Sequence, residues 1–240
     1  MRVVVTGASS GLGRAFAESV RAKYPDAELW VVGRNEAGLP EGEKLLLDLS
    51  TEAGRVRLEE RLKAQPPDLL VNCAGLAYYG SALTHTLEEE AEMVAVNVLA
   101  LQQLTLAAAS VMKGGTILNV SSAAGFLPFP GNATYSATKA FVTNFSEGLD
   151  LELEGIRVLA FCPGQIATPF SKRASKGRAL SITRRSVMPI EKTVEAMWQQ
   201  IERGKRVVVY DWRYWLGVKF LWLVPRGWLG RYLQAKVTSG

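Results

Sequence analysis

The sequence predicts an α/β fold in which one doubly wound parallel sheet of about seven strands carries helices on both faces. Short apolar runs, several of them rich in β-branched residues, recur along residues 1–210 and alternate with segments of helical spacing. Apolar runs of this kind are typical of strands that are buried on both sides. A glycine-rich turn follows the first run, and the hydrophobic content of 48% is ample for a large core.

The first 33 residues read as one strand–helix–strand unit. Residues 2–6 (RVVVT) and 28–33 (ELWVVG) predict buried strands, and residues 12–23 carry apolar side chains at helical spacing. Three glycines occupy the turn between the first strand and the helix, at positions 7, 11 and 13. Glycines let the backbone approach a pyrophosphate, whose charge the helix N-terminus attracts. This unit therefore predicts a dinucleotide-binding site, with a plain tight turn as the alternative.

The remaining elements follow the same alternation. Five further strands are expected at residues 44–47, 69–71, 116–120, 157–161 and 205–210. Long helices are expected at residues 87 to about 112 and at 189–203. We interpret residues 1–210 as one domain that includes the segment 171–186, with residues 211–240 as its basic, Trp-rich C-terminal extension.

Tyr135 and Lys139 form a candidate catalytic pair, because a spacing of four puts both side chains on one face of a helix. A phenol has a pKa near 10, and an ammonium about 4–6 Å away lowers it by roughly 1–3 units. Ser122 would then hold a carbonyl oxygen beside the phenol, which suits proton transfer to or from a carbonyl or alcohol. An amphipathic helix with a surface lysine is the alternative that spacing alone leaves open.

The glycine spacing in T-G-A-S-S-G-L-G resembles the T-G-x-x-x-G-x-G signature of the short-chain dehydrogenase/reductase family. Further motifs similar to those of the family follow in the expected order: Asp48-Leu49, Asn72-Cys73-Ala74-Gly75, Asn97, Ser122, Tyr135 with Lys139, and Pro163-Gly164 with Thr168. The sequence departs from the family's N-N-A-G at Cys73. The resemblance covers about residues 1–170. It implies a Rossmann-type sheet and an NAD(P)-dependent oxidoreductase that interconverts a carbonyl and an alcohol.

The resemblance also implies roles for individual residues. Tyr135 would be the general acid and base, Lys139 would lower its pKa and bind the nicotinamide ribose, and Ser122 would orient the carbonyl. Asn97 would support a proton relay, with a helix bend or cap as the alternative, and Ser121 is one residue too far from Tyr135 to replace Ser122. No metal is expected. The cofactor would be bound by Gly7, Ser9, Ser10, Gly11, Leu12, Gly13, Arg34, Asn35, Asp48, Leu49, Asn72, Ala74, Gly75, Tyr135, Lys139, Pro163, Gly164, Ile166 and Thr168.

The end of the second strand favours NADP(H) over NAD(H). Arg34 follows Gly33, and the first acidic residue after it is Glu36. A guanidinium pairs with the 2′-phosphate of NADP, whereas a carboxylate in this place selects the 2′-hydroxyl of NAD. The alternative is that Arg34 is only a loop charge. In the family NADP(H) usually accompanies reduction, so we expect a carbonyl reductase.

Composition excludes several other classes of protein. The two cysteines, Cys73 and Cys162, fit no metal spacing and are expected to stay reduced in a cytoplasmic protein. Residues 2–6 run directly into the glycine turn, so no signal peptide is expected, and no uncharged apolar run approaches 18 residues. His85, the one histidine, is expected in a surface or capping role rather than a catalytic one.

The basic charge belongs to the C-terminal part, because residues 171–240 carry 15 Lys+Arg against 4 Asp+Glu. Segment 171–186 contains no acid and is interpreted either as a substrate lid or as a solvated loop. With Ala77–Tyr79 and Phe126–Phe129, it is expected to line a pocket for an apolar small molecule.

Residues 212–233 interleave four tryptophans with arginine and lysine, which suits the headgroup boundary of a bilayer. Packing on the domain or on a second subunit is the alternative, and the resemblance implies a homodimer or homotetramer. Nucleic-acid binding is not expected, because the extension is too apolar for a phosphate groove. A cofactor-binding regulatory protein or a membrane-surface protein with little catalysis stays open as the alternative function.

Overall fold

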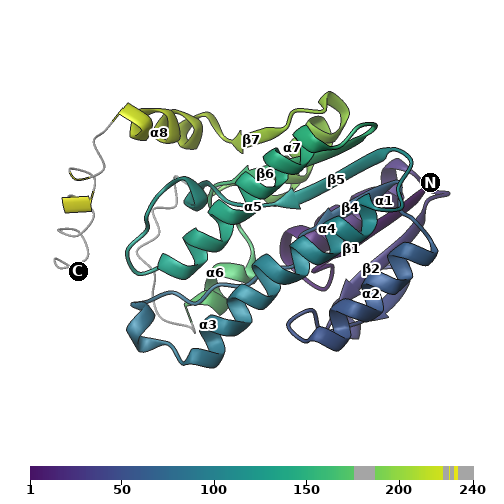
Figure 1. The fold of residues 1–240 in the computed structure, drawn as a ribbon, viewed down its shortest axis with the longest axis horizontal. Coiled ribbons are helices and arrows are strands. Elements are labelled where there is room, and N and C mark those ends of the chain that lie inside the picture. The colour runs from purple at the N-terminus through teal and green to yellow at the C-terminus, as the bar shows by residue number, and fades with distance from the viewer. Residues whose placement is uncertain (176–186, 224–226, 228–229, 232–240) are drawn as a thin grey trace.

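The computed structural model describes residues 1–175, 187–223, 227, 230 and 231. Seven parallel strands in this part of the chain form one sheet with the order β3-β2-β1-β4-β5-β6-β7 (Figure 1). The strands are β1 (Arg2–Thr6), β2 (Glu28–Gly33), β3 (Glu43–Leu46), β4 (Leu69–Asn72), β5 (Gly115–Val120), β6 (Ile156–Pro163) and β7 (Val207–Tyr210). The predicted doubly wound sheet is therefore confirmed, with strand ends within about two residues of the expected positions.

Helices cover both faces of the sheet (Figure 1). They are α1 (Gly11–Lys23), α2 (Glu52–Ala64), α3 (Leu87–Val94), α4 (Leu101–Ala109), α5 (Ala133–Glu152), α6 (Pro169–Ala174), α7 (Ile190–Arg203) and α8 (Trp212–Leu223). Short helical turns are η1 (Glu36–Gly38), η2 (Ala82–Thr84), η3 (Ala95–Ala100) and η4 (Ala123–Phe126).

Alternate side chains of β1 divide the core between the two faces, as the period of a strand requires. Val3 and Val5 pack with α1 and α7, where the rings of Phe16 and Trp198 stack at 4.6 Å between centroids. Val4 belongs to the other cluster, which α2, α4 and α5 cover. Both faces of the strand are thus buried, which explains why its sequence is a continuous apolar run.

The helical stretch Leu87–Ala109 is long and apolar enough to cross a membrane by length and composition, but half of its apolar window is buried inside the fold. Met93 and Leu104 on this stretch are each only 1% exposed. It is therefore a core helix in this structure. It begins with a capping box, in which Thr86 and Glu89 each bind the other's backbone, and its middle is the π-helical turn η3.

The strand order indicates where this fold would bind a ligand. β1 pairs with β2 on one side and with β4 on the other. The strands that follow β1 are added toward one edge of the sheet and those that follow β4 toward the other edge, so the strand order reverses between β1 and β4. In a doubly wound sheet, ligands bind beyond the carboxyl ends of the strands at such a switch point. The fold therefore directs attention to the loops after β1 and β4.

Candidate active site

A cavity of about 1010 Å³ lies at this switch point, along the carboxyl ends of β1, β2, β4, β5 and β6. All the residues predicted to act as catalyst or to bind cofactor line this cleft except Asn72 and Asn97. Arg34 follows β2, whereas Tyr135 and Lys139 lie near the end of β5, so these groups stand on opposite sides of β1 and β4. The glycine turn after β1 lies between them.

The glycines of this turn are required by close backbone approach. Gly7 has a φ of +67°, and a Cβ there would fall 2.8 Å from backbone atoms of Ala74. A Cβ on Gly13 would fall 2.5 Å from the carbonyl oxygen of Gly7. The first turn of α1 contains no acidic residue, and Ser10 at its N-cap makes no side-chain capping bond. The N-terminus of α1 is therefore a cradle suited to an anionic group.

Tyr135 and Lys139 project from α5 and are 9% and 5% exposed. The Lys139 Nζ lies 5.8 Å from the centroid of the Tyr135 ring and donates a hydrogen bond to the Val120 carbonyl oxygen at 2.8 Å. Ser122 lies two residues beyond β5, hydrogen-bonds to Tyr135, and accepts a bond from the Ala124 N–H at 3.1 Å. One hydroxyl, one phenol and one amine thus meet at a single end of the cleft.

Ser121, the other candidate serine, points elsewhere. Its hydroxyl donates to the Lys139 carbonyl oxygen at 2.8 Å and lies 2.7 Å from the Thr143 Oγ1, in the buried contact between β5 and α5. The geometry therefore favours Ser122 as the serine of the site, as the spacing to Tyr135 predicts.

Burial decides the protonation of this group. Burial raises the pKa of Tyr135 above its ordinary value, against a lowering by the Ser122 hydrogen bond, and burial lowers the pKa of Lys139 to about 8. The expected lowering of the tyrosine pKa by the lysine is not what this structure shows. The reason is that the phenol has lost its hydration while the lysine ammonium is directed at the Val120 carbonyl. The phenol therefore keeps its proton at neutral pH, as a general acid requires.

Asn97 and Asn72 lie behind the cleft instead of on it. Asn97, in η3, accepts from the Leu76 N–H at 2.9 Å and donates to the Leu76 carbonyl at 2.8 Å and to the Thr138 Oγ1 at 3.1 Å. Its side chain thus joins the loop after β4 to α5. Asn72 donates to Thr105 at 3.1 Å and to Asn119 at 2.9 Å inside the core. The Asn72 side chain therefore ties β4 to its neighbours and does not reach a ligand in the cleft.

Arg34 meets two carboxylates. Its Nη1 lies 3.1 Å from the Glu92 Oε1 and 3.7 Å from the Asp48 Oδ2, and its side chain is 58% exposed. Tyr78 donates a hydrogen bond to the other Glu92 oxygen at 2.5 Å. Glu92 lies 58 residues from Arg34 on α3, in an acid-rich stretch where no local signal marks it out from its neighbours. Sequence reasoning consequently missed it.

Part of the C-terminal extension packs on the domain, which the sequence left open as the alternative to a membrane contact, and forms a wall of the cleft. Tyr214 and Val218 on α8 line the cavity, and a Cβ on Gly164 would overlap the Tyr214 ring. Tyr214 Oη also accepts a hydrogen bond from the Gln165 N–H at 3.3 Å. The spacing of four between Tyr214 and Val218 is the helical signal that marks this inner face.

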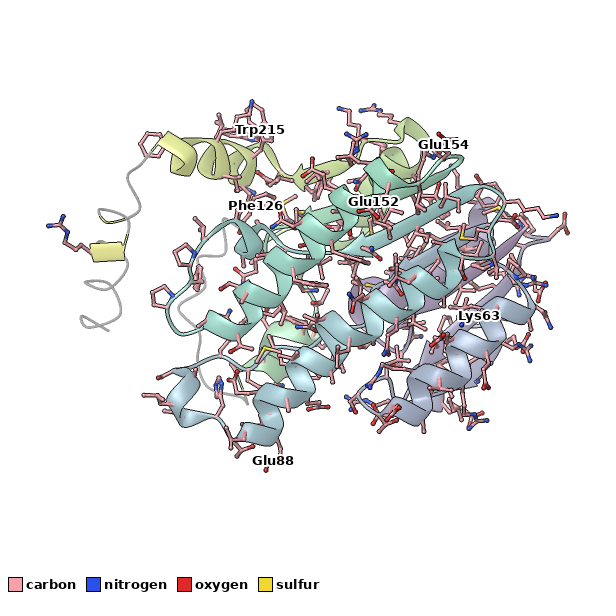
Figure 2. All side chains as sticks on the ribbon, in the orientation of Figure 1. Lys63, Glu88, Phe126, Glu152, Glu154 and Trp215 are labelled. Carbon is pink, nitrogen blue, oxygen red and sulfur yellow. The ribbon has the colours of Figure 1, made fainter. Side chains whose placement is uncertain are left out.

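The outer face of α8 is apolar and exposed. Trp212 is 69% exposed, Trp215 43% and Phe220 66%. Trp215 lies on the side of α8 that faces away from the rest of the fold, and Lys219 lies over its ring at 4.2 Å (Figure 2). Most of the segment interpreted as a substrate lid or a solvated loop, residues 176–186, lies outside the described part of the chain. The Trp222 and Trp228 side chains, for which a membrane contact is expected, lie outside it as well.

The other expected pocket residues lie where predicted in part. Ala77–Tyr79 line the cleft, as do Leu127 and Phe129 of the range 126–129, and Phe170 on α6 has its ring 6.0 Å from that of Tyr135. His85 does not line it, because its Nδ1 lies 2.6 Å from Glu90.

The two cysteines are free thiols. Burial raises the pKa of Cys73, at the cleft, to about 12, and that of Cys162 to about 11. Neither therefore has the thiolate character that a nucleophile needs. Within the described residues, no group of three or more His, Cys, Asp or Glu is arranged to hold a metal.

Comparison with known proteins identifies relatives. The profile of a family described as short chain dehydrogenase matches residues 1–179. An NADP-dependent 3-hydroxy acid dehydrogenase of Escherichia coli is 34% identical over 195 residues, which cover 74% of this chain and 77% of that protein. A short-chain dehydrogenase from Sphingobium yanoikuyae in complex with NADPH has a TM-score of 0.81 at 31% identity, covering 92% of each chain. A bulky-bulky ketone specific alcohol dehydrogenase from Comamonas testosteroni has a TM-score of 0.76 at 26% identity, covering 92% of this chain and 91% of that one.

The residues present fit a nicotinamide dinucleotide. The glycines let the turn pack closely against the loop after β4, at the N-terminus of α1, where no acidic residue competes for an anion. Buried Lys139 and Tyr135 stand at the other part of the same cleft. With the family profile matching most of the sequence, we conclude that this chain belongs to the short-chain dehydrogenase/reductase family of NAD(P)-dependent oxidoreductases.

Proposed function

We propose that this enzyme is an NADPH-dependent reductase that converts a carbonyl to an alcohol. The observation that carries the proposal is the buried Tyr135 phenol in the same cleft as the glycine cradle, with the Ser122 hydroxyl hydrogen-bonded to it and the Lys139 amine beside its ring. A phenol that holds its proton at neutral pH is prepared to give it to a carbonyl oxygen that gains negative charge.

In the proposed mechanism, a reduced nicotinamide held by the glycine turn and Lys139 would provide the hydride for the carbonyl carbon. Ser122 holds the carbonyl oxygen, and Tyr135 donates the proton that completes the alcohol. The Lys139 ammonium offsets the charge left on the phenol oxygen and would bind the nicotinamide ribose. Asn97 acts as a positioning residue, because its amide fixes the Leu76 loop and the Thr138 turn of α5 next to this group.

The preference for NADPH rests on Arg34. Its guanidinium stands half-exposed at the end of β2, where a 2′-phosphate would meet it. The 2′-phosphate would replace Glu92 as a partner of Arg34. Two relatives named above act with or bind NADP(H), the Escherichia coli dehydrogenase and the Sphingobium yanoikuyae enzyme, which supports this choice.

The substrate is proposed to be apolar. Leu127, Phe129, Phe170 and Val218 supply aliphatic and aromatic surface to the cleft near Tyr135. Apolar side chains bind a ligand through the area they remove from water. The ketone specificity named for the Comamonas testosteroni enzyme agrees with a roomy pocket of this kind.

The direct test is to mix purified protein and NADPH with a panel of aliphatic and aromatic ketones and aldehydes. The absorbance of the reduced cofactor should fall only with a substrate, and bulky apolar ketones should react faster than small polar ones. NADH in place of NADPH should give a lower kcat/KM. Cofactor binding without turnover of any carbonyl would favour a regulatory role on the same fold.

A second role is favoured by the exposed outer face of α8. Trp212, Trp215 and Phe220 form an apolar surface, and the Lys219 amine lies over the Trp215 ring. Aromatic rings between basic residues are stable at the boundary of a bilayer with anionic lipids. We propose a peripheral membrane contact there for a cytoplasmic enzyme, and packing against a second subunit of a dimer or tetramer is the outcome that would displace it.

A further inference from the structure

Helix α6 spans the cleft between its two walls. The Arg173 Nη2 donates a hydrogen bond to the Ser10 Oγ in the glycine turn at 3.0 Å. On the opposite wall, the Tyr79 N–H donates to the Ala174 carbonyl oxygen at 2.9 Å. Phe170 at the start of α6 approaches the ring of Tyr135. One short helix therefore touches the phosphate cradle and the carbonyl end of the site together.

The positive groups of the cleft differ in their partners. Among the described residues, four cationic side chains line the cavity: Arg34, Lys139, Arg173 and Arg213. Arg34 lies beside two carboxylates, Arg213 pairs with Asp211 at 2.6 Å, and Lys139 is at the phenol. The partner recorded for Arg173 is the neutral Ser10 hydroxyl, and no described carboxylate lies within ion-pair distance of it.

Arg173 thus brings a positive charge to the glycine turn, and none of the carboxylates that the structure describes is paired with it. The carboxylates lining the cleft, Asp48 and Glu92, are both held at Arg34 on the other side of the turn. Ser10 is the N-cap of α1, where the backbone N–H groups of the first helical turn add partial positive charge. This concentration of donors calls for an anion at the turn.

We propose that Arg173 binds the pyrophosphate of the cofactor. Its guanidinium exchanges the Ser10 hydroxyl for phosphate oxygens, which it contacts through two parallel N–H groups. Because Arg173 is on α6, this contact fastens α6 over the cofactor and holds Phe170 against Tyr135. The pyrophosphate is common to NADPH and NADH, so the contact is independent of the 2′-phosphate and of the reductase proposal.

The test is the dissociation constant of the cofactor for Arg173→Ala, measured by fluorescence titration of the full chain. Loss of a charge-assisted hydrogen bond should weaken NADPH and NADH by a similar factor, about 10- to 100-fold. ADP should weaken as well, whereas adenosine, which has no phosphate, should bind Arg173→Ala as it binds the wild type. Arg173→Lys keeps the positive charge but loses the two parallel N–H donors of the guanidinium. Its dissociation constants for NADPH and NADH should lie between those of the wild type and of Arg173→Ala.

The matched control is Arg14→Ala, which removes an equal charge from α1, where Arg14 pairs with Glu18 outside this cleft. It should leave the affinities for NADPH and NADH unchanged. Equal affinities for Arg173→Ala and wild type would overturn the proposal, as would a loss confined to NADPH. An equal loss for adenosine would also overturn it, because that result means a disturbed fold. Arg34→Ala separates this inference from the cofactor preference, because it should weaken NADPH alone.

Discussion

Replacing Tyr135 by phenylalanine should abolish most of the turnover while leaving the fold and the cofactor affinity nearly intact. The ring stays, so the contact with Phe170 and the buried packing are kept. The change removes the hydrogen bond to Ser122, whose oxygen still accepts from the Ala124 N–H. The stability cost is therefore that of one hydrogen bond, about 0.5–1.5 kcal/mol. Loss of the general acid should lower kcat by about 10²- to 10⁴-fold, or roughly 2.7–5.4 kcal/mol in the barrier.

The assay compares kcat, the dissociation constant of NADPH and the melting temperature for wild type and Tyr135→Phe. Tyr79→Phe is the matched control, because that phenol lines the same cleft and hydrogen-bonds to Ser171. It should cost about 2- to 10-fold, the value of one ordinary hydrogen bond. Near-normal turnover in Tyr135→Phe, or an equal loss in both variants, would refute the assignment of Tyr135 as the acid.

Three further predictions concern the cofactor, the buried amine and α8. Arg34→Ala should weaken NADPH by about 10- to 150-fold and NADH far less in fluorescence titrations, and equal weakening would mean that Arg34 does not read the 2′-phosphate. Burial lowers the pKa of Lys139 from 10.5 to about 8, so the unfolded chain holds the lysine proton between these values and the contribution of Lys139 to the free energy of unfolding rises with pH across this window. The stability of Lys139→Met relative to wild type should therefore be greater at about pH 7 than at about pH 10 in denaturant titrations, and a constant difference would contradict the burial argument. If α8 lies on a bilayer, anionic vesicles should shift the tryptophan emission to the blue, and salt should weaken the binding. The double variant Trp212→Ser, Trp215→Ser should then show no shift. If vesicles have no effect on the wild type and the double variant has an altered oligomeric state, α8 is a subunit contact instead. Substitution is preferable here to truncation after Tyr210, because Tyr214 packs on Gly164 and its loss would open the cleft.

Much of the fold was predictable because its signals are local. β1 and β2 have the bounds that their apolar runs predict, and the glycine turn lies between β1 and α1 as its spacing requires. A long helix was predicted at residues 87 to about 112 and ends at Ala109 in the structure, but the π-helical turn η3 within it was not predicted. A π-turn bonds a backbone N–H to the carbonyl five residues back instead of four, and this change leaves no mark in the period of so few residues.

The site was predictable where one element brings its residues together. Tyr135 and Lys139 share a face of α5, and the spacing to Tyr135 selected Ser122, whose hydroxyl lies at the phenol while that of Ser121 turns to the Lys139 carbonyl. The directions of their pKa values could not be read from spacing. They depend on how completely the fold removes water, and the ammonium also has a carbonyl partner on β5.

The sequence by itself determined the alternation of strands and helices, the glycine cradle and the Ser122–Tyr135–Lys139 set, because each depends on residues close together in the chain. Tertiary structure alone decided that Glu92 meets Arg34, that Arg173 reaches Ser10 across 163 residues, and that Tyr214 closes the cleft over Gly164. It also decided that Asn72 serves the core. The physical reason is that partners and burial are set by which elements the sheet order brings side by side, and no local pattern carries that information.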